Sequence, residues 1–118
     1  MGCTISATQY MTNYKFGSVV LIDFLQSDGI KKKRPALVML DIGDSDVVVV
    51  PITTRERKGV ADYKIKNWQD GGLLLASWIR LAKVSCLAKN NIDRPLGSIT
   101  NHDKRKMISL WKRIYSFT

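Results

Sequence analysis

The sequence predicts a β-rich α+β fold, in which a small, partly open barrel of strands is followed by one C-terminal helix. From Phe16 onward the chain has five or six short apolar segments, rich in β-branched residues and separated by turn residues. A single segment with helical spacing then ends the chain. The length of 118 residues, 45% of them hydrophobic, suits one domain with an ordinary core. We place this domain at residues 15–118.

Three strands are predicted in the first half of this domain. Residues 18–24 are mostly Val, Leu, Ile and Phe, a composition typical of a buried strand. A polar loop with an Asp-Gly pair is expected at 25–33, and further strands are expected at 35–40 and 47–52. Because a turn rich in Asp, Gly and Ser at 41–46 joins the last two, they should pair as a hairpin.

The second half predicts shorter and less regular strands. Apolar and basic residues alternate at 63–66, which indicates a half-exposed edge strand. Gly71-Gly72 ends it, and apolar runs at 73–81 and 84–87 predict further strand segments. Pro95-Leu96-Gly97 is expected to form a turn into the last element.

The last element is a predicted helix that begins after Thr100. Thr100 as N-cap, with Asp103 three residues later, forms a capping box in which Asp replaces the more usual Glu. The apolar face that should pack on the barrel consists of Met107, Ile108, Trp111, Ile114 and Tyr115. The basic residues expected to stay outside are Lys104, Arg105, Lys112 and Arg113.

Residues 1–14 have little pattern, and we expect them to be a disordered extension with Met11 as an alternative start. The alternative is a lipid-modified terminus, because Met1-Gly2-Cys3 opens a myristoylation motif. Cys3 and Cys86 lie far apart with no cleavable signal before them, which predicts reduced thiols in a cytoplasmic protein. No apolar run approaches the roughly 18 residues of a membrane span.

The charge of the chain favours a polyanionic partner. Nineteen Lys and Arg residues against ten Asp and Glu give a net charge of +9, which attracts RNA, DNA or an acidic protein. The most concentrated charge is Lys31-Lys32-Lys33-Arg34-Pro35, directly before an apolar strand. A guanidinium fixed at a strand start can hold two phosphate oxygens. The alternative is a solvated basic loop that serves only solubility.

Six sequence blocks resemble a known family. They are GSVVLIDF at 17–24, KRPALV at 33–38, VPIT at 50–53, GL at 72–73, SWIRL at 77–81 and LGSI at 96–99. In this order they resemble the MazF/PemK-like toxins of bacterial toxin–antitoxin systems, over nearly the whole chain from Phe16. Ser18 departs from the family, whose members commonly carry Asp there.

The resemblance implies an SH3-like, partly open barrel of the CcdB/MazF type that forms a homodimer. It implies a sequence-specific endoribonuclease that cleaves single-stranded mRNA through the ribose 2'-hydroxyl, without metal or other cofactor. It also implies a cognate antitoxin whose flexible tail occupies the RNA groove. The rival interpretation is a non-enzymatic toxin or binding module on the same fold, such as a CcdB-like gyrase poison or an RNA-binding protein.

Metal-free RNA cleavage needs a base, an acid and positive charge for the phosphorane. The resemblance assigns the active pair to Arg34 and Thr53, and a second catalytic or phosphate-binding arginine to Arg80. Without the resemblance, Thr53 is an ordinary strand threonine and Arg80 an arginine with its head in solvent. Some relatives place an Asp where this chain has Ala82. Asp28 is the substitute that the sequence offers, although Asp in an Asp-Gly turn is typically a turn former.

The expected RNA-binding residues lie on two basic loops and at one tryptophan. They are Lys31, Lys32, Lys33, Thr54, Arg55, Arg57, Lys58 and Trp68. Phosphate contacts from these residues would make affinity fall with salt. Trp68 either stacks a base or packs on the barrel rim. The single histidine, His102, excludes a mechanism that needs two histidines.

Overall fold

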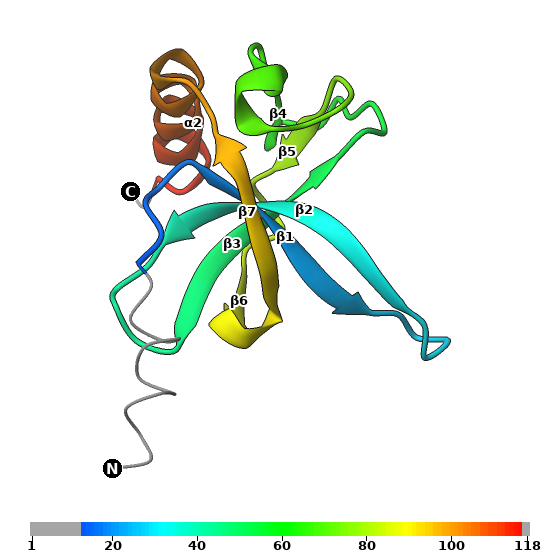
Figure 1. Ribbon diagram of the computed structural model, residues 1–118. Helices are drawn as coiled ribbons and strands as arrows, with labels where there is room; N and C mark the ends of the chain where they lie inside the picture. Colours follow the sequence, from blue (N-terminus) through cyan, green and yellow to red (C-terminus); the bar gives the residue numbers. More distant parts are fainter. Residues whose placement is uncertain (1–12, 117–118) are drawn as a thin grey trace.

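The computed structural model describes residues 13–116, in which seven strands form one antiparallel sheet that does not close (Figure 1). The strands are β1 (Ser18–Leu25), β2 (Lys31–Leu40), β3 (Asp46–Thr53), β4 (Asp62–Lys64), β5 (Trp78–Arg80), β6 (Ser85–Ala88) and β7 (Ile92–Ser98). Two 3-10 turns, η1 (Trp68–Gly71) and η2 (Lys89–Asn91), precede the helix α2 (Asn101–Ile114). The strand order is β4-β5-β3-β2-β1-β7, and β6 pairs with β3 outside this path.

The predicted β-rich α+β fold, a partly open barrel with a C-terminal helix, is confirmed. The strands predicted at 18–24, 35–40 and 47–52 correspond to β1, β2 and β3, and the predicted hairpin between the last two is present. β4 is the edge strand expected near Tyr63. None of the helices within residues 13–116 is long and apolar enough to cross a membrane.

Three predicted segments differ from the structure. The loop expected at 25–33 is shorter, because β1 and β2 pair as far as Leu25 and Lys31, so the three lysines lie inside a strand. The run at 73–81 is mostly irregular, and β5 covers only its end. The turn expected at Pro95-Leu96-Gly97 is wrong, since these residues lie in β7. β7 ends the strand order, where a proline without an N–H is tolerated.

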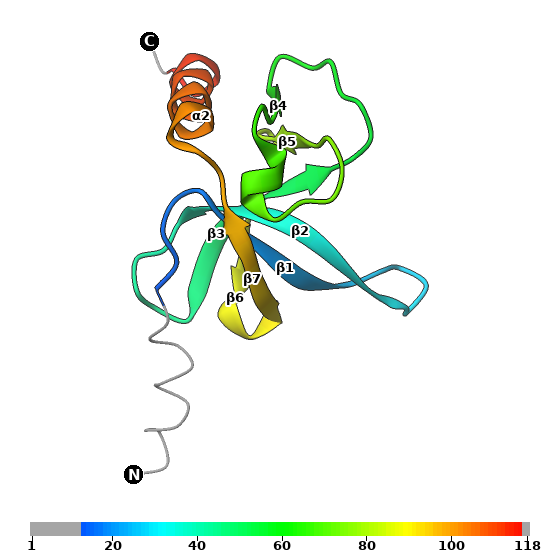
Figure 2. The ribbon, with the colours of Figure 1, turned by 45° about the horizontal axis from the view of Figure 1, so that its top comes forward.

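Alternating residues of β1–β3 serve two separate cores. Val19 pairs with Leu37 on one face, and Val20 pairs with Ala36 on the other. The larger core, on what we call the helix face, contains Val19, Leu37, Val50, Ile52, Ile65, Leu73, Ile79, Leu81, Ile99, Met107 and Leu110. The smaller core, on what we call the open face, contains Val20, Ala36, Val38, Val47 and Val49. Figure 2 shows α2 on the same side of β1–β3 as β4 and β5.

Helix α2 begins as predicted, but its buried face is rotated slightly. The Thr100 hydroxyl accepts the N–H of Asp103 at 3.3 Å, which confirms the N-cap. Met107 and Leu110 are buried, whereas Ile108, which was expected on the packed face, is 43% exposed. The spacing of Asp103, Met107 and Leu110 follows one helical stripe, and Ile108 lies beside that stripe.

The buried carboxylate of Asp103 joins α2 to the β4–η1 segment. It accepts the Tyr63 hydroxyl and the backbone N–H groups of Lys66 and Asn67, the last two at 3.0 Å. Burial alone would raise the pKa of Asp103, but these donors outweigh it and lower the pKa. Burial and the same carboxylate raise the pKa of Tyr63, so its hydroxyl stays protonated. The Asp of the predicted capping box therefore has a long-range function.

A second buried carboxylate, Asp41, fixes the start of the described chain. It accepts the Tyr14 N–H at 2.7 Å, the Gly43 N–H at 2.8 Å and the Lys89 ammonium at 2.9 Å. Burial alone would raise the pKa of Asp41, yet these partners lower it. The expectations for Met11, Cys3 and the rest of residues 1–12 lie outside the described residues, and Cys86 is an exposed free thiol.

Candidate active site

A cavity of about 650 Å³ lies on the open face, beside the smaller core. Its polar or charged lining residues are Asp23, Arg34, Thr53, Arg57, Arg80, Lys83, Ser85 and Asn91. Its apolar lining includes Phe24, Pro51 and Leu87. Three arginines in one cavity give it a strongly positive field.

Strand pairing explains why Arg34, Thr53 and Arg80 meet in this cavity. Arg34 lies two residues before Ala36, which pairs with Pro51, and Thr53 lies two residues after Pro51. Thr53 in turn pairs with Trp78, and Arg80 lies two residues beyond that tryptophan. Because side chains two residues apart on a strand share a face, all three point to the open face.

Arg34 is exposed on β2 and rests beside an aromatic ring. Its guanidinium carbon lies 5.8 Å from the centroid of the Phe24 ring, a cation–π contact. Among residues 13–116 the guanidinium makes no ion pair. Its charge is therefore available to an anion that enters the cavity.

The other two arginines have donors that are unused among residues 13–116. The Nε atoms of Arg57 and Arg80 are buried and, within the described part of the chain, have no hydrogen-bond partner. Asp62 lies 3.8 Å from the Arg80 Nε, which is an ion pair at a distance too long for a hydrogen bond. Unsatisfied guanidinium donors beside a cavity favour a ligand with acceptor oxygens.

Thr53 ends β3 and begins the turn that follows. Its hydroxyl oxygen accepts the backbone N–H of Arg55 at 3.1 Å. That bond fixes the side chain and leaves the hydroxyl proton free to be donated.

Asp28 is not brought to this cavity. Its carboxylate accepts the Ile30 N–H at 3.0 Å in the exposed turn between β1 and β2, which is the turn-forming role. Asp23 borders the cavity. Because it stands between Ile22 and Phe24 on β1, its side chain points to the opposite side of the sheet, where it lies beside its strand partner Lys33. Lys33 lies 2.8 Å from Asp23 and 3.0 Å from Asp93; these carboxylates raise the lysine pKa and compensate its positive charge.

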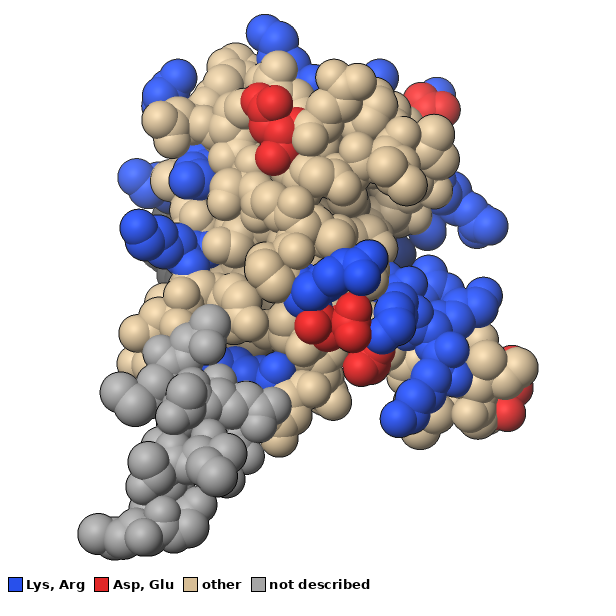
Figure 3. Space-filling view, in the orientation of Figure 1, with Lys and Arg blue, Asp and Glu red and all other residues tan. Residues whose placement is uncertain are grey.

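The remaining expected RNA-binding residues are spread over several surfaces. Lys31, Lys32, Arg55 and Lys58 are exposed and do not line the cavity. Thr54 borders a separate apolar cavity of about 450 Å³. Trp68 packs against the larger core, which agrees with the predicted alternative of packing on the barrel. Figure 3 shows Lys and Arg side chains gathered around the β1–β2 hairpin, with a few carboxylates beside them.

Sequence reasoning did not identify several lining residues as site residues, among them Phe24, Lys83, Ser85 and Asn91. The alternation of Val20, Ile22 and Phe24 along β1 carried a signal for Phe24, since it places the ring on the Arg34 face. The sequence carries no such signal for Asn91. This residue reaches the cavity because of where η2 lies after β6, which no local pattern predicts. No group of three or more His, Cys, Asp or Glu residues within 13–116 is placed to hold a metal.

Comparison with solved structures agrees with this architecture. An endoribonuclease from mycobacterial species is similar with a TM-score of 0.70 and 19% identity, over 87% of this chain and 91% of the other. An endoribonuclease in complex with its cognate antitoxin, also mycobacterial, has a TM-score of 0.73 and 17% identity over 89% and 97%. The MazE–MazF complex from Deinococcus radiodurans has a TM-score of 0.69 and 12% identity over 91% and 99%. At these identities the similarity establishes the fold.

The family is established by a separate comparison. No curated protein sequence matches the chain. The family model described as the PemK-like, MazF-like toxin of type II toxin–antitoxin systems matches residues 15–114, most of the chain. The resemblance found in the sequence is therefore confirmed. This chain belongs to the PemK-like, MazF-like toxins of type II toxin–antitoxin systems, a family of endoribonucleases.

Proposed function

We propose that this toxin cleaves single-stranded mRNA at specific sequences, without a metal, by attack of a ribose 2'-hydroxyl on the adjacent phosphorus. The observation that carries the proposal is the convergence of Arg34, Thr53 and Arg80 on one cavity of the open face. Family membership supports it independently.

The residues have separate roles in this reaction. Arg34 and Arg80 bind the non-bridging oxygens of the scissile phosphate and stabilise the charge of the phosphorane. The Thr53 hydroxyl donates a further hydrogen bond to the same group. As the 2'-oxygen bonds to phosphorus, the bond to the 5'-oxygen breaks, one proton leaves the 2'-hydroxyl and one reaches the 5'-oxygen. Asp28 has no part in this proposal, because it is held in the turn outside the cavity.

The test is cleavage of a long mRNA by the purified protein in EDTA. We expect cuts that leave a 2',3'-cyclic phosphate and a 5'-hydroxyl, and at least a hundredfold slower cutting by Arg34→Ala, about the cost of losing one oxyanion donor. Arg105→Ala is the matched control. Arg105 is exposed on α2, so this substitution removes the same charge at a position away from the cavity. A 3'-hydroxyl product, or a folded Arg34→Ala protein that cuts at the normal rate, would contradict the proposal.

The CcdB-like alternative is favoured by one observation, the alanine at position 82 where some relatives carry an acid. A gyrase poison would trap the topoisomerase on DNA and leave RNA intact. Incubation with gyrase and with mRNA in parallel separates the two functions.

The partners of the proposed function are mRNA, a cognate antitoxin and a second copy of the chain, in the cytoplasm. Two of the similar structures contain an antitoxin or MazE. An acidic antitoxin tail suits the arginine-lined cavity. Its binding should therefore compete with RNA.

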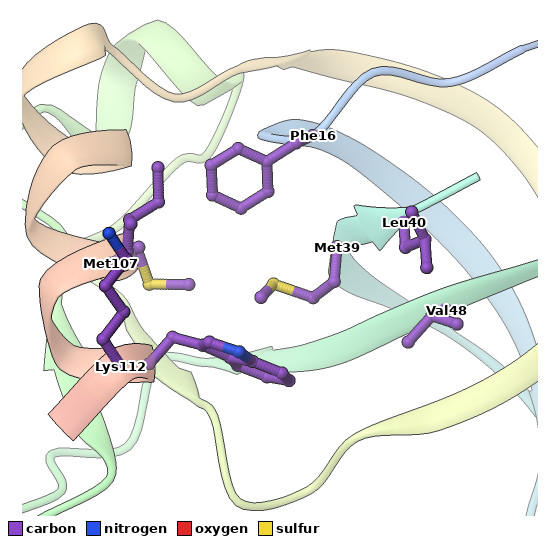
Figure 4. A pocket seen from close by; sticks show the side chains of 8 residues that line it. Phe16, Met39, Leu40, Val48, Met107 and Lys112 are labelled. Carbon is purple, nitrogen blue, oxygen red and sulfur yellow. The ribbon is translucent and has the colours of Figure 1, made fainter. Parts of the chain in front are cut away.

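An apolar hollow of about 370 Å³ supports the homodimer (Figure 4). It lies between α2 and the sheet and is lined by Phe16, Met39, Leu40, Val48, Met107, Ile108, Trp111 and Lys112. Leu40 is 54% exposed and Ile108 43%. Sedimentation should show a dimer that Ile108→Glu dissociates and that Leu74→Glu, at an exposed residue outside the hollow, does not. A monomeric normal protein would contradict this part of the proposal.

A further inference from the structure

Phe24 is an aromatic side chain in an unusual position. It lies on β1 at the border of the arginine-lined cavity and is 46% exposed. Val20, four residues earlier on the same face of the strand, is fully buried. The ring is therefore not part of the smaller core, although it continues the same alternation.

The sheet register fixes the surroundings of the ring. Phe24 pairs with Lys32, and Arg34 lies one step diagonally across on the same face. The Arg34 guanidinium lies over one face of the ring, 5.8 Å from its centroid. Almost half of the residue still meets solvent. The arrangement presents an aromatic surface between a lysine and an arginine.

We propose that Phe24 is a stacking platform for one unpaired base of the bound RNA, next to the phosphate that Arg34 holds. This inference rests on the proposed function. Single-stranded RNA is recognised largely by bases that stack on aromatic side chains beside a positive groove. Because every base has an aromatic face, Phe24 orders one nucleotide without reading its identity. The base covers the exposed ring and brings its phosphate to Arg34.

The experiment measures both cleavage and binding by the full chain. The substrate is a single-stranded RNA oligonucleotide with one mapped cleavage site, and its uncleavable analogue carries a 2'-deoxy sugar at the attacking position. Phe24→Leu should weaken binding to the analogue by roughly 5- to 150-fold, the range of base–aromatic stacking. Phe24→Trp should bind at least as well as the normal protein. Leu74→Ala, which removes an exposed apolar side chain outside the cavity, is the control.

A set of abasic analogues identifies the stacked base. Removing one particular base next to the cleavage site should weaken binding to the normal protein by the same factor as Phe24→Leu. The same removal should not weaken binding by the Phe24→Leu protein any further. Circular dichroism verifies that each variant is folded.

Two results would overturn the inference. One is normal binding by Phe24→Leu. The other is a loss that stays the same for every abasic analogue, which would mean that the ring acts only through Arg34. Either result in a protein that still cleaves RNA leaves the proposed function intact. A normal protein that neither cuts nor binds the oligonucleotide overturns both.

Discussion

At the scale of single residues, the carboxylate of Asp103 joins segments that are far apart in the sequence. It lies on α2 and accepts hydrogen bonds from β4 and from the two residues just before η1. A buried charge of this kind is stabilising only while its donors remain, since each lost donor leaves an acceptor unsatisfied. Its surroundings lead to two predictions.

Tyr63→Phe should lower the free energy of unfolding by about 1.5–3 kcal/mol, because it removes a hydrogen bond to a charged group. Tyr115→Phe is the matched control, since its hydroxyl donates to a neutral acceptor, the Leu81 carbonyl, at 3.0 Å. That change should cost only about 0.5–1.5 kcal/mol. Urea unfolding measures both values, and equal losses would contradict the special role of Asp103.

Stability should fall at acid pH. The pKa values of Asp103 and Asp41 are lowered in the folded chain, so both groups bind protons more readily when unfolded. Their contribution is therefore present above the unfolded pKa of about 3.9 and is lost as pH falls through the lowered folded values. Urea unfolding between pH 7 and pH 2 should show this loss, with a smaller slope for Asp103→Asn. Constant stability across this range would refute the prediction.

At the scale of elements, the sequence predicted the strands and the helix start that are formed by local interactions. β1 to β3 follow from β-branched runs, and the start of α2 follows from the Thr100 cap. β7 could not be predicted from its Pro-Leu-Gly sequence, because its extended form depends on pairing with β1. Likewise, the sequence predicts a loop at the lysines, because the pairing that extends β2 is not visible in their composition.

In the candidate site, too, the sequence predicts some residues, whereas their placement depends on tertiary structure. The sequence blocks singled out Arg34, Thr53 and Arg80, and strand register then brings them together. The sequence suggests Asp28 because its loop could bring it opposite Arg34, whereas the carboxylate bonds the Ile30 N–H within its own turn and does not line the cavity. The alternation along β1 puts Phe24 on the Arg34 face, but the exposure of its ring could not be predicted, because it depends on where the smaller core ends.

A buried ion pair joins the β2–β3 turn to η2, beside the backbone hydrogen bond from the Lys89 N–H to the Ser45 carbonyl. Lys89 and Asp41 have side chains that are 2% and 0% exposed. Lys89→Met should cost about 3–5 kcal/mol of unfolding free energy, because it leaves a buried carboxylate without its cation. Lys33→Met, which removes a lysine that is 52% exposed from its ion pairs with Asp23 and Asp93, should destabilise the fold far less. Thermal and urea unfolding compare the two, and similar losses would contradict the importance of burial.

At the scale of the whole molecule, the charge of +9 should make RNA binding depend strongly on salt. If the three arginines of the cavity each neutralise one phosphate, the logarithm of affinity should fall with the logarithm of salt at a slope of about −2. Affinity for the uncleavable analogue would then fall roughly 15- to 20-fold between 50 and 200 mM salt.

The same measurement assigns the individual contacts. Arg57→Ala should make the slope shallower by about 0.7, while Arg105→Ala should leave it unchanged. An unchanged slope for Arg57→Ala would exclude a phosphate contact by that residue.

The two cores on opposite sides of β1 restrict how this strand can evolve. Its odd and even positions belong to different parts of the protein, with Val19 in one core and Val20, Ile22 and Phe24 on the other side. Substitutions can be tested one position at a time, but inserting or deleting one residue exchanges the two sides for everything beyond it. Such a change before Val19 would turn Phe24 away from Arg34 and one valine out of each core at once. The strand should therefore tolerate a change of length less well than a substitution at any single position.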